Sequence, residues 1–317
     1  MSSYSNFHVD LNNTNSSWTK VYELVSNGST ILDIGCSSGY FDKVLIDEKD
    51  CIVDGIEIDP EDAARAKDVC RKLLIGSIED ENLDLSQLPT DKYDFIMFID
   101  VLEHLLYPSS ALKRVARLLK PNGKILFSIP NMANNSVRMQ LLQGDFDYEP
   151  SGLLDETHLH YYTDKTIDKM IKDSGMYLQD ITSTQNDISS QVIKEVVSRV
   201  GLNYTKEFDN YLNSGNAIAY QYIGTIGKTK SLKTVADYAQ KTLKPVHYNE
   251  NTLRSVQKDA RSLFKRLQAA EATVSERDQT ISRLGEEMAI IKLRLDATPG
   301  RKLKRILNRA LQKLHKR

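Results

Sequence analysis

The sequence predicts an α/β fold in which helices cover both faces of a mostly parallel β-sheet with an antiparallel edge. In the first 230 residues, short apolar runs alternate with longer segments whose apolar residues recur at helical spacing. Continuous apolar runs, such as residues 95–99, are typical of strands buried on both faces. Alternation of strand and helix predicts crossover connections between parallel strands.

Seven runs are expected to be strands: 30–34, 52–58, 73–75, 95–99, 124–129, 177–184 and 217–226. Amphipathic segments such as 61–71 and 109–119 separate the first five runs and are expected to be helices. Only the stretch 189–200 lies between the last two runs. Because it gives no clear crossover, we expect the antiparallel edge at this end of the sheet.

The composition is that of a globular protein, with 40% hydrophobic residues and 42 Lys and Arg against 43 Asp and Glu. No run approaches the roughly 20 apolar residues of a membrane span, and no secretory signal pattern is present, so we expect neither a spanning nor a secreted protein. The cysteines Cys36, Cys51 and Cys70 have no metal-ligand spacing and cannot all pair. A reducing, cytoplasmic setting is therefore expected.

The charge is unevenly distributed along the chain. Residues 231–317 carry 20 Lys and Arg against 9 Asp and Glu, whereas residues 1–230 carry 22 against 34. The sequence predicts an α/β domain over 1–230, a helical linker over 231–252, a coiled coil over 253–296 and a basic amphipathic tail over 297–317.

The segment 253–296 has apolar residues at alternating spacings of three and four over about six heptads, with Arg277 at one polar position. This pattern predicts self-association through a coiled coil, although mixed core residues do not choose the oligomer order. A helical hairpin that folds back on the domain at 1–230 is the alternative.

Pro299 and Gly300 are expected to end this helix. The stretch 301–317 then combines one apolar stripe with basic residues and no acidic residue. Such a helix suits an anionic membrane surface, an acidic protein partner, or nucleic acid, or is simply solvated. Several copies on a coiled coil would add weak membrane contacts together, which favours a peripheral location on the inner face of the cell membrane.

The strongest local motif is the run Ile-Leu-Asp-Ile-Gly-Cys-Ser-Ser-Gly-Tyr at 31–40. A strand that ends in a glycine-rich turn before a helix lets backbone N–H groups approach a ligand closely. A pyrophosphate-binding loop looks similar, but Ser37 stands where that fingerprint has another glycine. Glu57, about 20 residues on, can accept hydrogen bonds from both ribose hydroxyls. The sequence thus predicts a nucleoside rather than a diphosphate.

The order of motifs resembles a class I S-adenosylmethionine-dependent methyltransferase, a Rossmann-like fold with a seven-stranded sheet. The loop at 33–39, Glu57, the turn at 74–79, the strand and exit at 93–105 and the turn and strand at 118–131 match that family in order. Ser37 and Ser77 replace a commoner glycine and aspartate. The resemblance implies S-adenosylmethionine as cofactor, bound by Asp33, Gly35, Cys36, Ser37, Gly39, Tyr40, Glu57, Ile58, Gly76, Ser77, Ile78, Asp100, Val101 and His104. Tyr40 is alternatively a core aromatic.

A second block, 144–148 with 152–163, is similar to bacterial methyltransferases of polysaccharide and glycan assembly, as is the entry segment 8–17. This similarity implies a sugar or glycan acceptor. A sugar hydroxyl is a poor nucleophile at neutral pH, so a general base would help. We expect His158 as base and Asp155 as its orienting carboxylate, with His160 as a further catalytic candidate. Alternatively, His158 caps or packs a loop over the cofactor.

The Asp-x-x-His-x-His spacing at 155–160 would also suit a divalent metal, but magnesium prefers carboxylates and water, and we expect no metal. The sequence thus predicts an O-methyltransferase for a sugar hydroxyl of a cell-surface glycan or its precursor. The alternative is a non-catalytic scaffold of methyltransferase fold in a glycan-assembly complex. A nucleic-acid substrate is disfavoured, because residues 1–230 are acidic and the exit at 100–103 lacks an Asn-Pro-Pro-aromatic clamp.

Overall fold

The computed structural model describes residues 9–89, 92–186 and 188–242. The chain divides into two compact units, Met1–Val246 and His247–Arg317, and all described residues lie in the first. The predicted coiled coil and basic tail fall outside the described residues. Helix α9 (Val235–Thr242) lies in the segment expected to be a linker, and it packs against α6 (Asp164–Asp173) of the first unit.

The sheet has seven strands in the order β3-β2-β1-β4-β5-β7-β6. The strands are β1 (Thr30–Ile34), β2 (Ile52–Glu57), β3 (Lys72–Ile75), β4 (Tyr93–Ile99), β5 (Leu119–Pro130), β6 (Tyr177–Gln185) and β7 (Ala219–Gly227). The first five are parallel, while β7 pairs antiparallel with both β5 and β6. The α/β fold and its antiparallel edge are therefore confirmed.

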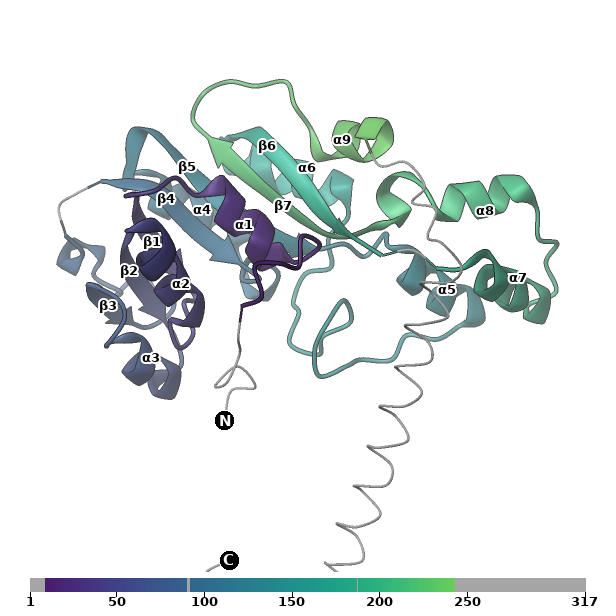
Figure 1. Ribbon diagram of the computed structural model, residues 1–317, viewed down its shortest axis with the longest axis horizontal. Coiled ribbons are helices and arrows are strands. Elements are labelled where there is room, and N and C mark those ends of the chain that lie inside the picture. The colour runs from purple at the N-terminus through teal and green to yellow at the C-terminus, as the bar shows by residue number, and fades with distance from the viewer. Residues whose placement is uncertain (1–8, 90–91, 187, 243–317) are drawn as a thin grey trace, which may run out of the picture. The chain divides into compact units, whose positions relative to one another are not determined.

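Two layers of helices sandwich the sheet (Figure 1). The layer of α1 (Ser17–Leu24), α2 (Tyr40–Lys49) and α3 (Pro60–Ala66) packs on one face, where Val21, Leu45 and Ala66 meet Ile31 and Met97. The layer of α4 (Pro108–Ala116), α6 and α9 packs on the other, where Leu112 and Ile167 meet Ile96 and Phe98. Burial on both faces explains why the central strands read as continuous apolar runs.

Two element boundaries differ from the sequence prediction. The helix expected over 61–71 ends at Ala66, because the backbone N–H of Arg71 already bonds to the Val53 carbonyl as the chain approaches β3. Strand β5 begins at Leu119 rather than 124, with a register shift opposite Tyr93–Phe95. Irregular pairing of this kind leaves little trace in the hydrophobic pattern.

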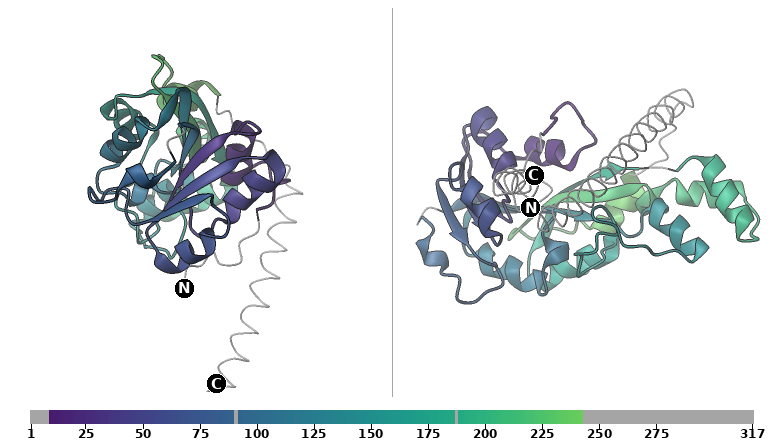
Figure 2. Two further views of the ribbon diagram at one scale, coloured as in Figure 1. Left: turned by 90° about the vertical axis from the view of Figure 1, so that its left-hand side faces the viewer. Right: turned by 90° about the horizontal axis from the view of Figure 1, so that it is seen from below.

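Three further helices, α5 (Asn135–Gln143), α7 (Ser190–Arg199) and α8 (Lys206–Leu212), gather at the end of the unit away from β3 (Figure 2). Met139, Val197 and Leu212 form part of their common core. Buried asparagines join this group to the sheet, since Asn131 and Asn134 both donate to the carbonyl of Ala219 at the start of β7.

After α5, residues 144–163 return to the exit of β4. The backbone N–H groups of Leu159 and His160 both donate to the carbonyl of Glu103, at 2.9 and 3.0 Å. The N–H of Met132 also donates to the Tyr162 carbonyl at 2.7 Å. These bonds fix the segment over the carboxyl ends of β4 and β5, where an α/β fold of this type binds its ligand.

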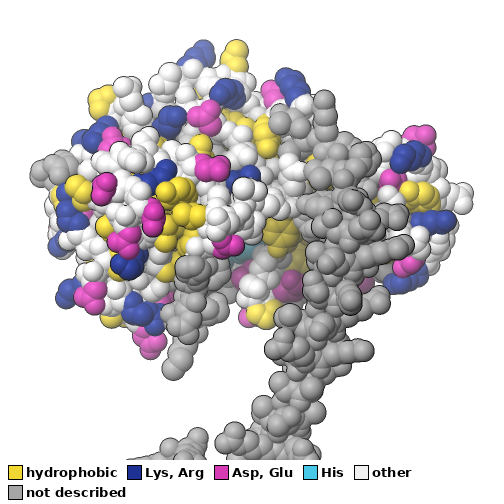
Figure 3. Space-filling view, in the orientation of Figure 1, with side chains coloured by type: hydrophobic (Ala, Val, Ile, Leu, Met, Phe, Trp, Pro, Cys, Tyr) yellow, Lys and Arg dark blue, Asp and Glu magenta, His cyan; other side chains and the backbone are white. Residues whose placement is uncertain are grey.

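On the face shown in Figure 3, acidic and basic side chains of the described residues are interspersed without a continuous basic patch. That nucleic acid is disfavoured as a substrate stays a prediction. Within the described part of the chain, no helix is both long enough and apolar enough to cross a membrane.

Candidate active site

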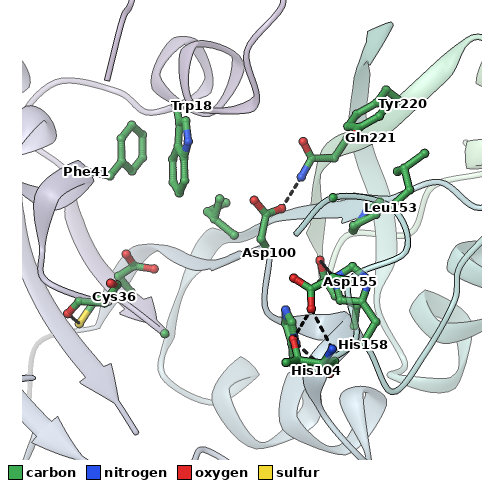
Figure 4. Close-up of a pocket in the computed structure, with 18 of the residues that line it drawn as sticks. Trp18, Cys36, Phe41, Asp100, His104, Leu153, Asp155, His158, Tyr220 and Gln221 are labelled. Atoms are coloured by element: carbon green, nitrogen blue, oxygen red, sulfur yellow. Dashed lines mark hydrogen bonds and ion pairs between the residues drawn. The ribbon is translucent and has the colours of Figure 1, made fainter. Parts of the chain in front are cut away.

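A cavity of about 350 Å³ opens at the carboxyl ends of the central strands. Figure 4 shows Trp18 and Phe41 on one side of it, Leu153 and Tyr220 on the other, and Asp100 between them. Its walls come from α1, the loop after β1, the exit of β4, residues 152–158 and β7. Segments far apart in the sequence therefore build one site.

The loop after β1 needs small residues for geometric reasons. Gly35 has φ 75°, and a Cβ atom on it would lie 2.7 Å from Cγ2 of Val101, so a side chain would collide with the exit of β4. Ser37 also has a positive φ of 48°, and its hydroxyl donates to Asp62 at 3.1 Å. A hydroxyl that ties the loop to α3 explains how serine is accommodated at this position.

Glu57 organises the loop from the end of β2. Its Oε2 accepts from the N–H of Ser37 at 2.7 Å, and its Oε1 accepts from the N–H groups of Ile58 and Asp59 at 2.8 and 2.9 Å. Its carboxylate is thus oriented before any ligand binds. Each carboxylate oxygen can accept more than one hydrogen bond, so ribose hydroxyls can still be received.

Asp100 adopts a positive φ of 56° at the exit of β4. Its N–H donates to Oγ of Ser128 at 2.9 Å, and its Oδ1 accepts from that hydroxyl at 2.5 Å and from the amide of Gln221. Burial raises the pKa of Asp100, and the hydrogen bond from Ser128 opposes this shift. The carboxyl group is thereby held in one orientation toward the cavity.

Two histidine rings meet in the cavity wall, with centroids of His104 and His158 4.8 Å apart (Figure 4). Nδ1 of His104 lies 3.2 Å from both the carbonyl and the hydroxyl of Thr157. Nε2 of His158 lies 4.0 Å from Oε1 of Glu103, and these two side chains are only 5% and 1% exposed. A histidine and a carboxyl group are therefore buried together at the surface of the cavity.

Burial, followed by the nearby His104, lowers the pKa of His158, while Asp155 and the Leu153 carbonyl oppose the shift. A neutral imidazole at physiological pH can act as a proton acceptor. Oδ1 of Asp155, the predicted orienting carboxylate, accepts from the N–H and the hydroxyl of Thr157 at 2.8 and 2.6 Å, while the charge of Asp155 raises the pKa of His158.

The charge of the cavity is one-sided. Four carboxyl groups line it, those of Asp33, Asp100, Glu103 and Asp155, and no described Lys or Arg does. Burial raises the pKa of Asp33, which also faces the carboxyl group of Asp42, and it raises the pKa of Asp100 and Glu103. Such a cavity favours a cationic ligand, because a positive charge stabilises the ionised carboxylates.

The structure brings together a little over half of the residues predicted from sequence. Those lining the cavity are Asp33, Gly35, Cys36, Ser37, Tyr40, Asp100, His104, Asp155 and His158. Those outside this wall are Gly39, Glu57, Ile58, Gly76, Ser77, Ile78, Val101 and His160. Tyr40 both lines the cavity and packs on Trp18, at a ring distance of 5.4 Å, and its contact with the cofactor stays a prediction.

Among the residues outside the wall, Ile58 is 65% exposed at the end of β2, whereas Ile78 is buried in the core. The Ser77 hydroxyl accepts from the N–H of Glu79 at 3.1 Å. His160 turns to the carbonyl of Leu106, 3.3 Å from Nε2, so the structure does not place it beside His158 and Asp155.

Sequence reasoning missed several wall residues, among them Trp18, Glu103 and Gln221. Gln221 lies on β7 and reaches Asp100 only through the fold, so no local motif signals it. Glu103 lies next to His104 in the strand exit at 93–105 that carries the family resemblance. Its burial was not visible in the sequence.

Two groups of potential metal-binding atoms occur among the described residues. Glu103, His104 and His158 each place one atom within 4.8 Å of the others, and so do Cys36, Asp42 and Cys70. In the second group, Sγ of Cys70 bonds to Asp42 at 3.6 Å inside the core. The expectation of no metal stays a prediction.

Comparison with known protein families identifies the family to which the chain belongs. Residues 16–180 match the family model described as a methyltransferase domain. The chain belongs to this methyltransferase family. Its cofactor is S-adenosylmethionine, whose ammonium and sulfonium cations suit the acidic cavity.

Curated relatives of this methyltransferase include the ubiquinone biosynthesis O-methyltransferases of Aeromonas salmonicida and Hydrogenovibrio crunogenus. The first is 27% identical over 189 residues, covering 57% of this chain and 76% of the relative. The second is 25% identical over 172 residues, covering 51% and 67%. An Archaeoglobus fulgidus methyltransferase structure aligns with TM-score 0.46 and 16% identity, over 71% of this chain and 97% of that one. The narrower resemblance to glycan-assembly enzymes rests on the segments at 8–17 and 144–163 alone.

Proposed function

We propose that this methyltransferase transfers the methyl group of S-adenosylmethionine to a hydroxyl group, with His158 as general base. The observation that carries the proposal is the buried His158 imidazole in the wall of an acidic cavity, with its pKa lowered by burial. A sulfonium methyl reacts by in-line approach, so positioning the hydroxyl and removing its proton are the tasks left to the protein.

The roles of the cofactor residues follow from their positions. Glu57 would accept the ribose hydroxyls, and the backbone at Gly35 and Ser37 would lie against the cofactor. Asp33 and Asp100 would face its cationic methionine part. S-adenosylmethionine supplies the activated methyl group, while these residues bind and orient it.

The acceptor side of the cavity adjoins a row of aromatic rings. The ring of Tyr161 lies 6.1 Å from His158 and 5.9 Å from Phe146, which in turn contacts Tyr148 at 5.6 Å. Aromatic side chains bind flat acceptors, such as a phenol, and the apolar face of a sugar. The sugar hydroxyl suggested by the segment at 144–163 and the phenolic hydroxyl suggested by the relatives' names are both served by the same base.

The proposed setting is the cytoplasm, with self-association through 253–296 and membrane contact through 301–317. Deleting only 301–317 should weaken binding to vesicles that contain anionic phosphatidylserine, because eight basic residues are lost. Equal binding by both forms would instead favour a protein partner for this segment.

The test of function is transfer of tritiated methyl from S-adenosylmethionine to a panel of catechols, nucleotide sugars and glycan extracts. We expect labelled product with at least one hydroxyl class and a loss of roughly 100-fold in kcat in His158→Ala. If the protein binds the cofactor but His158→Ala is as fast as the wild type, the base assignment is wrong. If it does not bind the cofactor at all, the scaffold alternative is favoured.

A further inference from the structure

Glu103 has no structural reason to be a glutamate. Its side chain is 1% exposed, and among the described residues neither carboxyl oxygen has a hydrogen-bond partner. Burying a polar group without a partner costs free energy, and an apolar side chain would fill the same space at lower cost. The backbone of Glu103, by contrast, is well used, since its carbonyl accepts from Leu159 and His160. A partner for this carboxyl group therefore has to come from a molecule that binds in the cavity lined by Glu103.

The geometry identifies where that partner lies. Oε1 of Glu103 and Nε2 of His158 are 4.0 Å apart, too far for a direct hydrogen bond. An oxygen atom about 2.8 Å from both would fit between them, because two such sides close a triangle on a base of that length. A hydroxyl group in this position directs its single proton between the two acceptors, as in a bifurcated hydrogen bond, so that the same proton faces Nε2 of His158 and Oε1 of Glu103.

Neighbouring groups leave this role to Glu103. Asp155 is held by Thr157, and Asp100 by Ser128 and Gln221. The remaining titratable neighbours among the described residues are His104, whose Nδ1 faces Thr157, Tyr162, and Tyr161, whose ring lies 6.1 Å from that of His158. Within the described residues, Glu103 is thus a carboxyl group beside the base that no other residue's side chain or backbone already occupies.

We propose that Glu103 and His158 form a catalytic pair that receives the acceptor hydroxyl between them, an inference that rests on the proposed O-methyl transfer. His158 Nε2 takes the hydroxyl proton as the oxygen attacks the methyl carbon, and the carbon–sulfur bond breaks with its electron pair going to sulfur. The positive charge lost from sulfur reappears on the imidazolium. The Glu103 carboxylate, ionised beside the cationic cofactor, stabilises that imidazolium.

Burial and the neighbouring Asp100 raise the pKa of Glu103 in the cofactor-free protein. A bound cation opposes this shift, so the carboxylate forms when the cofactor is present. Glu103 is then ionised beside a neutral His158 only in the cofactor complex. The strength of His158 as a base would thereby depend on cofactor binding.

The first test measures the pair without an acceptor. NMR of the six histidines, labelled with ¹⁵N, should give the His158 pKa in protein saturated with sinefungin, a cationic analogue that cannot transfer methyl. In Glu103→Gln that pKa should fall by roughly half a unit or more, because a negative neighbour is removed. Asp209→Asn, a buried carboxyl change on α8 outside the cavity wall, is the matched control and should leave it unchanged. An equal His158 pKa in wild type and Glu103→Gln would overturn the proposal.

The second test measures turnover with a catechol or nucleotide sugar that the panel has identified. Glu103→Gln should lower kcat at least about tenfold and keep the KM for S-adenosylmethionine within about threefold, and Glu103→Asp should recover part of the rate. Loss of wild-type activity on chelation, restored by Mg²⁺, would overturn the proposal, because a cation would then occupy the space assigned to the hydroxyl. If the wild type methylates no hydroxyl, the proposed function fails, and the NMR result still reports on the pair.

Discussion

Glu57 shows how one side chain can prepare a binding site before its ligand arrives. Three backbone N–H groups orient its carboxylate, on the loop and at the exit of β2. The sequence predicted a ribose acceptor at this position but not the contact with Ser37. The position of Glu57 suits both holding the loop and binding the ribose, because the hydrogen bonds that hold the loop also orient the carboxylate.

Glu57→Gln should weaken binding of S-adenosylmethionine by roughly tenfold or more, because hydrogen bonds to a charged acceptor are lost and an amide N–H would oppose the backbone donors. Titration calorimetry of the folded variant measures this. Glu61→Gln, an exposed change on α3, serves as the control. An unchanged Kd in Glu57→Gln would remove the ribose assignment.

His158 makes the reaction sensitive to acid. Its pKa is lowered from the ordinary value of 6.5 by burial and by His104, so its neutral, base-competent form persists below that pH. We expect kcat/KM to fall on acidification and not at higher pH, with a midpoint below pH 6.5. This acidic limb of the pH profile should be absent from the residual activity of His158→Gln. His160→Gln should retain the limb, since that ring faces Leu106. A limb that follows His160 would reverse the assignment of the two histidines.

At the scale of elements, the hydrophobic pattern predicted all seven strands and the antiparallel edge, because burial on both faces leaves continuous apolar runs. The pattern was less informative at the boundaries. Helix α3 ends early and β5 starts early because of backbone bonds to Val53 and of irregular pairing with β4. Those contacts depend on neighbours far along the chain.

The junction of β1 and α2 contains a buried carboxyl pair, Asp33 and Asp42, that the sequence did not reveal. Burial raises the pKa of Asp42 to about 7, against 3.8 for a free carboxyl, while hydrogen bonds from Asp33 and Cys70 oppose the shift. The folded state therefore holds a proton that the unfolded state loses at lower pH. Its stabilising contribution is fully present below about pH 4 and is lost as the pH rises through about 7.

Asp42→Asn removes this titration and supplies an amide that donates to Asp33. The Tm of the variant minus the Tm of the wild type should be larger at pH 8 than at pH 5, by at least about 2 °C. Thermal unfolding at the two pH values measures the change. Asp47→Asn, a change at an exposed position on the same helix, should leave the Tm difference from wild type unchanged between the two pH values. If Asp42→Asn also leaves it unchanged, Asp42 is not a buried, protonated group.

For the whole molecule, the sequence predicts that catalysis and self-association belong to separate segments of the chain. The catalytic unit contains every described site residue, whereas the predicted coiled coil lies outside the described residues. The site itself was only partly predictable, since the loop and strand exits carry local motifs but Trp18, Gln221 and the burial of Glu103 depend on the assembled fold. Motifs thus indicated the cofactor better than the acceptor.

Deleting residues 253–317 should convert an oligomer to a monomer that binds S-adenosylmethionine with unchanged affinity, because the site residues all precede Val246. Light scattering after size exclusion gives the mass, and calorimetry gives the affinity. An oligomer of the same order after the deletion would contradict the coiled coil.

Titration calorimetry of the full chain with S-adenosylmethionine, followed by S-adenosylhomocysteine, is the direct test of the cofactor site. We predict one site per chain with a micromolar Kd for both ligands, and weaker binding of the second, since it lacks the sulfonium charge that the acidic cavity favours. No heat of binding at millimolar ligand would contradict the assignment of this cavity as a working methyltransferase site.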